Sequence, residues 1–399
     1  MLPGTPGSTG LSSAYTGDTL SRLNERDVGG ILTEHYTYTP GKGTGTTTTL
    51  PQQFYTTRKG SSTSLGGYTY TYDNMGNITM ATDVVTEYYW AYSYNAQGQL
   101  RYSTYYNQDD VAQERYYYYY DNAGNLTKRQ ERDSTGTKVL KERRYVYKNT
   151  SWKDLLTEVN EVPLTYDASG NPLSYYNGAH YTMTWRNGRQ LSTVATGGKT
   201  YSYEYDANGL RTRRTNSDGG YTLYYIVDGL TVGEQQYTAS GSIRRTMKYL
   251  LDENNSPVGI SIHYPSYSDG IWDNYYFAKN LQGDVTAIYN SSGALQARYT
   301  YDPYGNITSV TNASGAAISP TAANVANYNP FRYRGYYYDA DTGFYYLKTR
   351  YYDPELGRFI NADGYASTGQ SIPGYNMFAY CNCDPIDYVD ETGDLYVLK

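Results

Sequence analysis

One short pattern recurs along this 399-residue chain and constrains its fold more than any other feature. The unit is Tyr-x-Tyr-Asp-x-x-Gly-Asn followed by Leu or Ile, and neighbouring copies often lie about 20 residues apart. Self-similarity at a fixed period is typical of repeat architectures, in which each unit packs on its neighbours. Clear copies begin at Tyr70, Tyr92, Tyr118, Thr165 and Tyr299, and weaker ones at Thr184 and Tyr203.

The repeated unit predicts a β-hairpin. Because side chains alternate along a strand, Tyr-x-Tyr places two rings on one face. Asp followed three residues later by Gly fits a type I turn, with Asp at its first position and Gly at its fourth. Since one hairpin is only marginally stable alone, we expect the units to pair edge to edge into a continuous sheet.

Tyrosine dominates the apolar composition. It accounts for 55 of the 399 residues, whereas phenylalanine occurs six times. The tyrosine ring is apolar, but its hydroxyl needs a polar partner or water. This balance favours a sheet around a wide lumen, with water near both faces, over a solid sandwich core. Because no long segment has a 3.6-residue period, the prediction is an all-β chain.

Charge and hydropathy argue against two classes of partner. The formal net charge is −6, whereas nucleic-acid binding needs clustered Lys and Arg. No segment approaches ~18 consecutive apolar residues, so we expect no membrane span. The N-terminal sequence lacks the basic and apolar regions of a signal peptide, so export would need another route or an upstream segment.

We expect neither a metal site nor a cofactor. The two cysteines, Cys381 and Cys383, are too few for a disulfide framework and lack partner ligands for zinc. The three histidines, His35, His180 and His263, are isolated in the sequence. The chain also lacks a phosphate-binding loop and a nucleophile-elbow motif.

The region after the repeats is more specific than the repeats themselves. It reads NPFRYRGYYYD at 329–339, TGFYYLKTRYYDP at 342–354 and GRF at 357–359. A second segment, NMFAYCNCDPIDYVD, follows at 376–390. Together with the repeats, these segments resemble the YD-repeat proteins of the Rhs family and their Rhs repeat-associated core. The resemblance covers roughly residues 68–394.

The resemblance implies an architecture and a function. Its fold is a spiral of β-hairpins that forms a hollow shell, closed at the C-terminal end by the core as a plug. Residues 1–67 are then a Gly/Thr/Ser-rich divergent or poorly ordered segment, and residues 68–328 the YD-repeat β-shell. Residues 329–394 are the core, and 395–399 a residual tail from which the toxin domain is absent.

The implied function is that of a shell and delivery module of a polymorphic toxin. Its partners would be a missing or separately encoded toxin domain and an upstream shell segment. The protein would be secreted or at the cell surface, as part of a longer protein. The alternative is a surface or wall-associated adhesin that binds carbohydrate through its tyrosine-rich sheet. Cross-strand packing is the more usual role of tyrosines at this spacing.

In many members of the family the core cuts the toxin free by an aspartyl-protease-like reaction. The two aspartates of that motif correspond to Asp363 and Asp390, 27 residues apart, although the prolines usual beside them are absent. Two close carboxylates cannot both ionise cheaply, so one keeps a proton while the pair activates water. Arg358 is the expected electrostatic neighbour, and the cut is expected near Asp394–Leu395. The alternative interpretation is that both aspartates are turn residues beside glycine.

Overall fold

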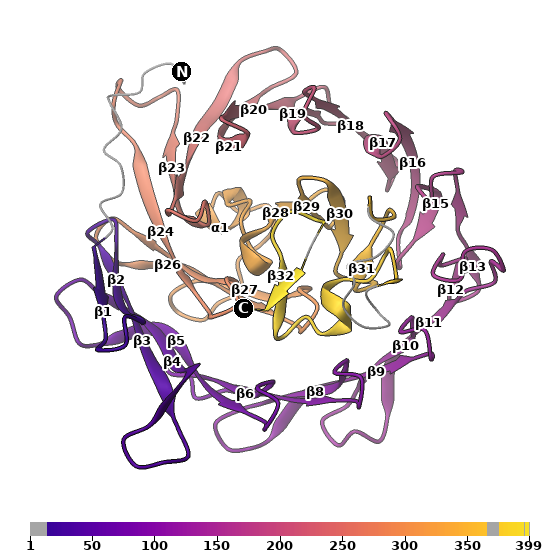
Figure 1. The fold of residues 1–399 in the computed structure, drawn as a ribbon. Coiled ribbons are helices and arrows are strands. Elements are labelled where there is room, and N and C mark those ends of the chain that lie inside the picture. The colour runs from indigo at the N-terminus through magenta and orange to yellow at the C-terminus, as the bar shows by residue number, and fades with distance from the viewer. Residues whose placement is uncertain (1–13, 365–374, 395, 399) are drawn as a thin grey trace. The chain divides into compact units, whose positions relative to one another are not determined.

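The computed structural model describes residues 14–364, 375–394 and 396–398. Nearly all of the regular structure in these residues is antiparallel β-strand, which confirms the all-β prediction. Strands consecutive in sequence are neighbours in their sheets, as Figure 1 shows along the colour gradient. No helix in the described part of the chain is long and apolar enough to cross a membrane.

The chain divides into two compact units, each of which is built from separate stretches of sequence. Two strands, β7 (Tyr89–Tyr94) and β20 (Tyr221–Val227), contain points at which the chain passes from one unit to the other. The predicted segments 68–328 and 329–394 therefore differ from the compact units, because they were defined by their sequence motifs. Unit 1 comprises Met1–Tyr89, Tyr224–Asp302 and Ile307–Gly335, and unit 2 comprises Trp90–Leu223, Pro303–Asn306 and Tyr336–Lys399.

Unit 1 contains two antiparallel meanders. The strands of the first are β1 (Tyr15–Gly17), β2 (Leu23–Val28), β3 (Leu32–Pro40), β4 (Thr47–Arg58), β5 (Ser64–Tyr72) and β6 (Ile78–Asp83). Those of the second are β21 (Leu230–Tyr237), β22 (Ile243–Leu251), β23 (Pro257–His263), β24 (Asp273–Lys279), β25 (Val285–Asn290), β26 (Leu295–Tyr301) and β27 (Ile307–Thr311). A short helix and a 3-10 turn follow, α1 (Val325–Tyr328) and η1 (Tyr333–Gly335).

Unit 2 contains two further meanders and the C-terminal elements. The first meander is β8 (Leu100–Tyr106), β9 (Ala112–Tyr120), β10 (Leu126–Arg132), β11 (Val139–Val146), β12 (Glu158–Val159) and β13 (Val162–Pro163). The second is β14 (Thr165–Tyr166), β15 (Pro172–Tyr176), β16 (His180–Arg186), β17 (Gln190–Thr196), β18 (Lys199–Tyr205) and β19 (Arg211–Thr215). Then come β28 (Tyr337–Asp339), β29 (Phe344–Leu347), β30 (Arg350–Asp353), β31 (Arg358–Phe359), η3 (Cys381–Cys383), β32 (Tyr388–Asp390) and β33 (Tyr396–Leu398).

The repeated turn has the geometry that its sequence predicts. The N–H of Gly76 donates to the carbonyl of Asp73 at 3.2 Å, and the N–H of Asp73 donates to the carbonyl of Asn77 at 2.9 Å. Gly76 has a left-handed φ of 92°. The strand register shifts between Thr71 and Tyr72. This is a type I turn followed by a glycine bulge, a connection that suits the twist of a hairpin.

The aspartate side chain caps the same turn. Oδ1 of Asp121 accepts hydrogen bonds from the N–H groups of Ala123 and Asn125, both at 2.9 Å. Its Oδ2 accepts one from Nδ2 of Asn125 at 3.0 Å. The equivalent contacts recur at Asp73 and Asp167. The Asp and the Asn of the repeat are therefore hydrogen-bond partners within each turn.

Tyrosine hydroxyls connect some of the hairpins to the one before. The hydroxyl of Tyr120 donates to the carbonyl of Leu100 at 2.8 Å, and that of Tyr147 donates to the carbonyl of Leu126 at 3.0 Å. Phenylalanine would fill the same space without satisfying that carbonyl. The contact accounts for the use of tyrosine rather than phenylalanine at Tyr120, which ends β9, and at Tyr147, which directly follows β11.

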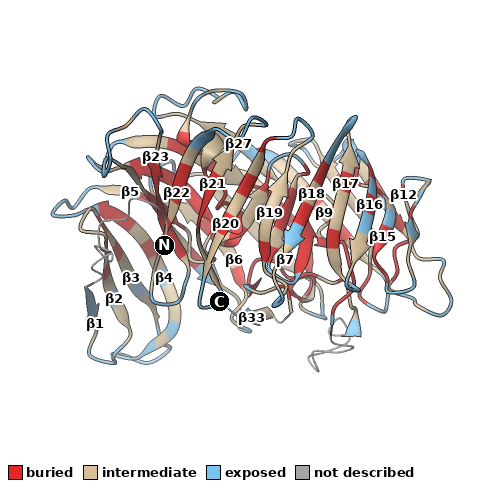
Figure 2. Cartoon of the chain, turned by 90° about the horizontal axis from the view of Figure 1, so that it is seen from above, coloured by how far each residue is buried: buried red, intermediate tan, exposed pale blue. Residues whose placement is uncertain are grey.

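Unit 2 has a large apolar core on one face of its sheet. Along β16, Tyr181 and Met183 are buried while His180, Thr182 and Thr184 are exposed, an alternation visible in Figure 2. The core includes residues from β11, β12 and β15 to β18, from the connections near β12 and β14, and from the C-terminal segment. The latter are Phe344, Tyr351, Leu356 and Ile360. The Rhs-like core segment thus packs against the repeat strands of its own unit.

The N-terminal segment is more regular than its composition predicted. Four strands, β1 to β4, lie within residues 14–67, which were expected to be divergent or poorly ordered. The Gly-rich stretch at 41–46 is a connection, but Thr47 to Thr49 begin the long strand β4. The physical reason is that threonine is β-branched and pairs well on a pleated surface once a neighbouring strand is present. Residues 1–13 lie outside the described part.

The capped turn gives a stability prediction. We expect Asp121→Ala to lower the free energy of unfolding by about 1–3 kcal/mol, because the buried N–H of Asn125 loses its acceptor. Asp109→Ala, at an exposed acid in a neighbouring loop, is the matched control and should change stability by less than about 0.5 kcal/mol. Urea unfolding of both variants measures the difference, and equal effects would contradict a capping role.

Candidate functional site

The structure brings the two predicted aspartates together through a residue that the sequence analysis did not select. Asp363 follows β31 and Asp390 ends β32, and both are buried. One nitrogen of Arg350, Nη2, lies 2.9 Å from Oδ2 of Asp363 and 3.4 Å from Oδ2 of Asp390. The two carboxylates therefore share a single buried cation.

Arg350 is held in place by several contacts of its own. It is the first residue of β30, and its guanidinium donates to the carbonyls of Met377, at 3.2 Å, and Gly393. Its guanidinium carbon lies 3.5 Å from the ring centre of Phe359. Burial lowers the pKa of Arg350, and the neighbouring carboxylates oppose that shift. Arginine stays protonated in proteins, so Arg350 keeps its positive charge beside the two aspartates.

Arg358, the predicted neighbour of the aspartates, contacts other groups. Its guanidinium donates to the hydroxyl of Tyr147 at 2.8 Å and to the carbonyl of Asp154 at 2.9 Å. It also lies 4.8 Å from the ring centre of Phe378. Arg350 occupies the position beside the carboxylates that was expected for Arg358.

Asp390 has two kinds of contact at once. Its Oδ1 accepts from the N–H groups of Gly393 at 2.7 Å and Thr392 at 3.2 Å, and so caps a turn. Its Oδ2 faces Arg350. Burial raises the pKa of Asp390, although Arg350 and the two turn N–H groups lower it. Asp390 is thus a turn residue, as one interpretation held, and also a member of the carboxylate pair.

Asp363 is anchored by its backbone. Its N–H donates to the carbonyl of Met377 at 2.8 Å, and its carbonyl accepts from the guanidinium of Arg189, which precedes β17. A turn of the repeats therefore helps to place the first aspartate. The arrangement resembles an acid–base pair chemically, because a buried carboxyl group with a raised pKa, such as Asp390, can keep a proton beside a second carboxyl group.

Both cysteines lie in the left-handed turn η3, between the two aspartates in sequence. Cys381 and Cys383 are buried and have positive φ values, of 48° and 61°. The thiol of Cys383 donates to the carbonyl of Gly124 at 3.4 Å, and burial raises its pKa to about 12. A thiol with so high a pKa is a poor nucleophile at neutral pH.

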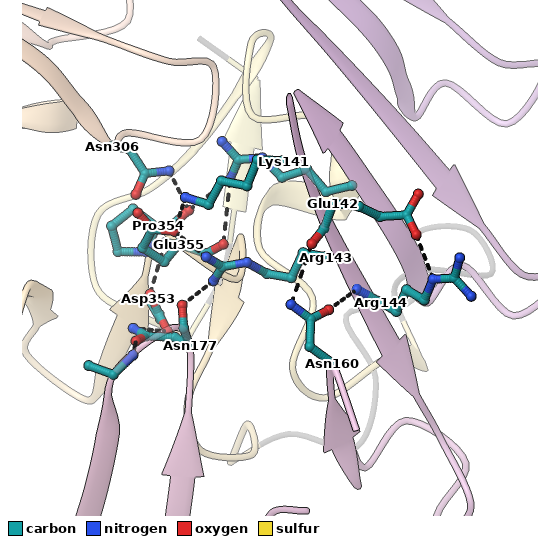
Figure 3. Close-up of polar contacts among 12 residues, drawn as sticks. Lys141, Glu142, Arg143, Arg144, Asn160, Asn177, Asn306, Asp353, Pro354 and Glu355 are labelled. Atoms are coloured by element: carbon teal, nitrogen blue, oxygen red, sulfur yellow. Dashed lines mark hydrogen bonds and ion pairs between the residues drawn. The ribbon is translucent and has the colours of Figure 1, made fainter. Parts of the chain in front are cut away.

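A second buried polar network holds the turn that follows β30 (Figure 3). Oδ2 of Asp353 accepts from Nδ2 of Asn177 at 2.9 Å. It also accepts from the hydroxyl of Tyr175 at 2.9 Å. Glu355, two residues later, pairs with Arg143 of β11 at 2.6 Å. These contacts tie the core segment to repeat strands of unit 2, close in sequence to the Arg350 that bridges the aspartates.

Comparisons with protein families agree with the repeat pattern. A family model described as Teneurin YD-shell matches residues 271–386, and one described as RHS Repeat matches residues 185–221. The chain is 32% identical over 242 residues to the tRNA3(Ser)-specific nuclease WapA of Bacillus spizizenii, a match that covers 60% of this chain and 9% of the relative. It is 26% identical over 298 residues to the double-stranded DNA deaminase toxin A of Burkholderia cenocepacia, covering 68% and 19% respectively.

Solved structures show the same fold. The TcdB2–TccC3 crystal structure superposes with a TM-score of 0.75 at 20% identity, over 95% of this chain and 20% of the other. The Photorhabdus luminescens Tc holotoxin pore gives a TM-score of 0.74 at 21% identity, over 95% and 19%. The chain thus has the β-shell fold of these proteins, and it spans less than a quarter of the length of each relative named above.

The Asp353 network gives a pH prediction. Burial raises the pKa of Asp353 from its ordinary 3.8 to about 6. The folded protein therefore holds this proton more tightly than the unfolded chain does. The resulting stability is fully present below pH 3.8 and is lost as the pH rises through about 6. Ionisation of Asp353 should lower the free energy of unfolding by up to about 3 kcal/mol between pH 4 and 7. We expect Asp353→Asn, whose side chain cannot ionise, to remove this fall, as measured by urea unfolding across that pH range.

Glu355→Gln is the matched control with the opposite sign. Burial raises the pKa of Glu355, but Arg143, Arg129 and Lys141 outweigh it and hold the pKa below its ordinary value. This ion pair stabilises the fold above the ordinary pKa of the glutamate, so the substitution should cost stability at neutral pH and less in acid. Parallel pH profiles for wild type and Asp353→Asn would contradict the prediction.

Proposed function

The chain belongs to the Rhs/YD-repeat family, and from this premise we propose that it is the shell-and-core module of an Rhs-type toxin. One observation carries the proposal. Relatives whose names state different activities, a tRNA nuclease and a double-stranded DNA deaminase, match the same kind of sequence over 60% and 68% of this chain. A stretch shared by proteins of different activity fits a carrier of the effector better than it fits the effector itself.

The carrier role sets the partner and the location that we propose. The partner is a polypeptide effector, held or presented by the shell, together with further shell strands. The protein would act outside the producing cell, either secreted or at its surface. Fusion of a small nuclease after Lys399 tests this role. The fused nuclease should resist an added protease that degrades the same nuclease on a short flexible linker, and equal degradation would contradict the role.

We further propose that Asp363 and Asp390 hydrolyse the chain's own backbone at Asp394–Leu395. Asp390, whose pKa is raised, fits the proton donor, and Asp363 fits the base that takes a proton from water. The water oxygen bonds to the carbonyl carbon of Asp394, the C–N bond breaks, and the amine of Leu395 receives the proton. The shared Arg350 supports this role by stabilising the charges that develop. Leu395 lies outside the described residues.

Intact-mass spectrometry over time tests the self-cleavage. We expect the wild type to lose residues 395–399 slowly, because the prolines that would preorganise both turns are absent. Asp363→Asn and Asp390→Asn should keep full length. Asp269→Asn, an exposed acid in unit 1, is the matched control and should behave as the wild type. Full-length mass in every variant would reduce both aspartates to structural residues.

A further inference from the structure

The turn between β29 and β30 faces the segment that the proposed reaction would cut. Leu347 pairs with Arg350 across this turn, and Lys348 between them has a left-handed φ of 64°. A residue with a Cβ atom rarely adopts this conformation, and when it persists the surroundings hold it. The N–H of Thr349 donates to the carbonyl of Leu347 at 2.7 Å and, at 3.2 Å, to that of Thr392.

Donors of this turn converge on two successive carbonyls of the segment. The hydroxyl of Thr349 donates to the carbonyl of Thr392 at 2.9 Å, in addition to the N–H bond. The next carbonyl, that of Gly393, accepts from Nε of Arg350. Main-chain carbonyls are present whatever the side chains are, so these bonds fix the register of the segment rather than selecting its side chains.

Gly393 is seated so closely on the turn that no side chain would fit. A Cβ atom there would lie 2.7 Å from Oγ1 of Thr349, 2.8 Å from the carbonyl oxygen of Leu347 and 3.1 Å from the nitrogen of Arg350. Its φ of 84° is also in the left-handed region. Glycine is therefore required for both conformation and space.

The chain is also held on the far side of Leu395. Strand β33 pairs with β32, so that Tyr396 lies opposite Asp390 and Val397 opposite Val389. The ring of Tyr396 packs edge-on against that of Tyr388, with centroids 5.4 Å apart. The predicted tail is thus partly a strand. The backbone accepts hydrogen bonds at Thr392 and Gly393, and from Tyr396 it pairs as a strand.

We infer that the turn Leu347–Arg350 is a clamp that selects the bond to be cut, with Thr349 as its positioning residue. The clamp rests on the proposed self-cleavage. It holds the two carbonyls immediately before Asp394, while the strand pair holds the residues after Leu395. The substrate is a polypeptide with glycine at the second position before the cut, bound through its main chain. A peptide bond whose neighbours are held in place loses less entropy when it reaches the reactive geometry, so it reacts faster.

Three substitutions in the full chain test the clamp by intact-mass spectrometry. Thr349→Val keeps the size of the side chain but removes the hydroxyl, and should slow cleavage about tenfold and spread it over neighbouring bonds. Thr349→Ser restores the hydroxyl and should restore both the rate and the single cut. Gly393→Ala cannot seat on the turn and should slow cleavage by about a hundredfold. Equal melting temperatures for the two Thr349 variants exclude a merely structural effect.

The outcomes separate the clamp from the reaction. Cleavage of Thr349→Val at the wild-type rate and bond overturns the clamp while leaving the self-cleavage intact. An uncleaved wild type overturns the self-cleavage, and amide hydrogen exchange then judges the contact itself. The Thr349 N–H should be protected in the wild type and less protected in Gly393→Ala, where the bond to Leu347 remains and the one to Thr392 is lost. An unprotected Thr349 amide in the wild type overturns the clamp.

Discussion

The capped turn is the constraint on which the rest of this structure depends. It combines a type I turn, a left-handed glycine and an aspartate that accepts from the backbone on the far side. Because side chains alternate along a strand, a slip of one residue would exchange the two faces of a hairpin. The turn fixes that register at each copy, so the tyrosines stay on the faces where their hydroxyls meet the preceding hairpin.

The buried charges of unit 2 are tolerated because they are shared. A lone buried carboxylate is costly, whereas one that meets a cation and backbone donors is not. Arg350 serves two carboxylates with one nitrogen, and Asp390 satisfies its other oxygen with the N–H groups of a turn. Asp390 therefore both caps a turn and belongs to the candidate site, and the two roles are compatible because each uses a different carboxylate oxygen.

Local features were predictable from the sequence, and contacts across the chain were not. The strands and turns of the repeats follow from tyrosine spacing and from Asp and Gly positions. Arg358 was selected because it lies five residues before Asp363, whereas Arg350 lies thirteen before it and no spacing rule marks it. Its role comes from the contacts that Arg350, at the start of β30, makes with Asp390 and Gly393. The strands within residues 14–67 were missed because glycine and threonine suggest a loop when pairing partners are unknown.

The reach of each tyrosine hydroxyl has a consequence for how such a chain evolves. Tyr120 and Tyr147 each donate to a carbonyl of the hairpin immediately before their own. Insertion or loss of one whole unit therefore replaces such a hydrogen bond with one of the same chemistry. Insertion of part of a unit instead moves the nearby tyrosines away from the carbonyls to which they donate. Gene duplication and unequal recombination can lengthen or shorten the array in whole units at little cost. For these hairpin-to-hairpin contacts copy number is free to drift, while the sequence within each copy is held.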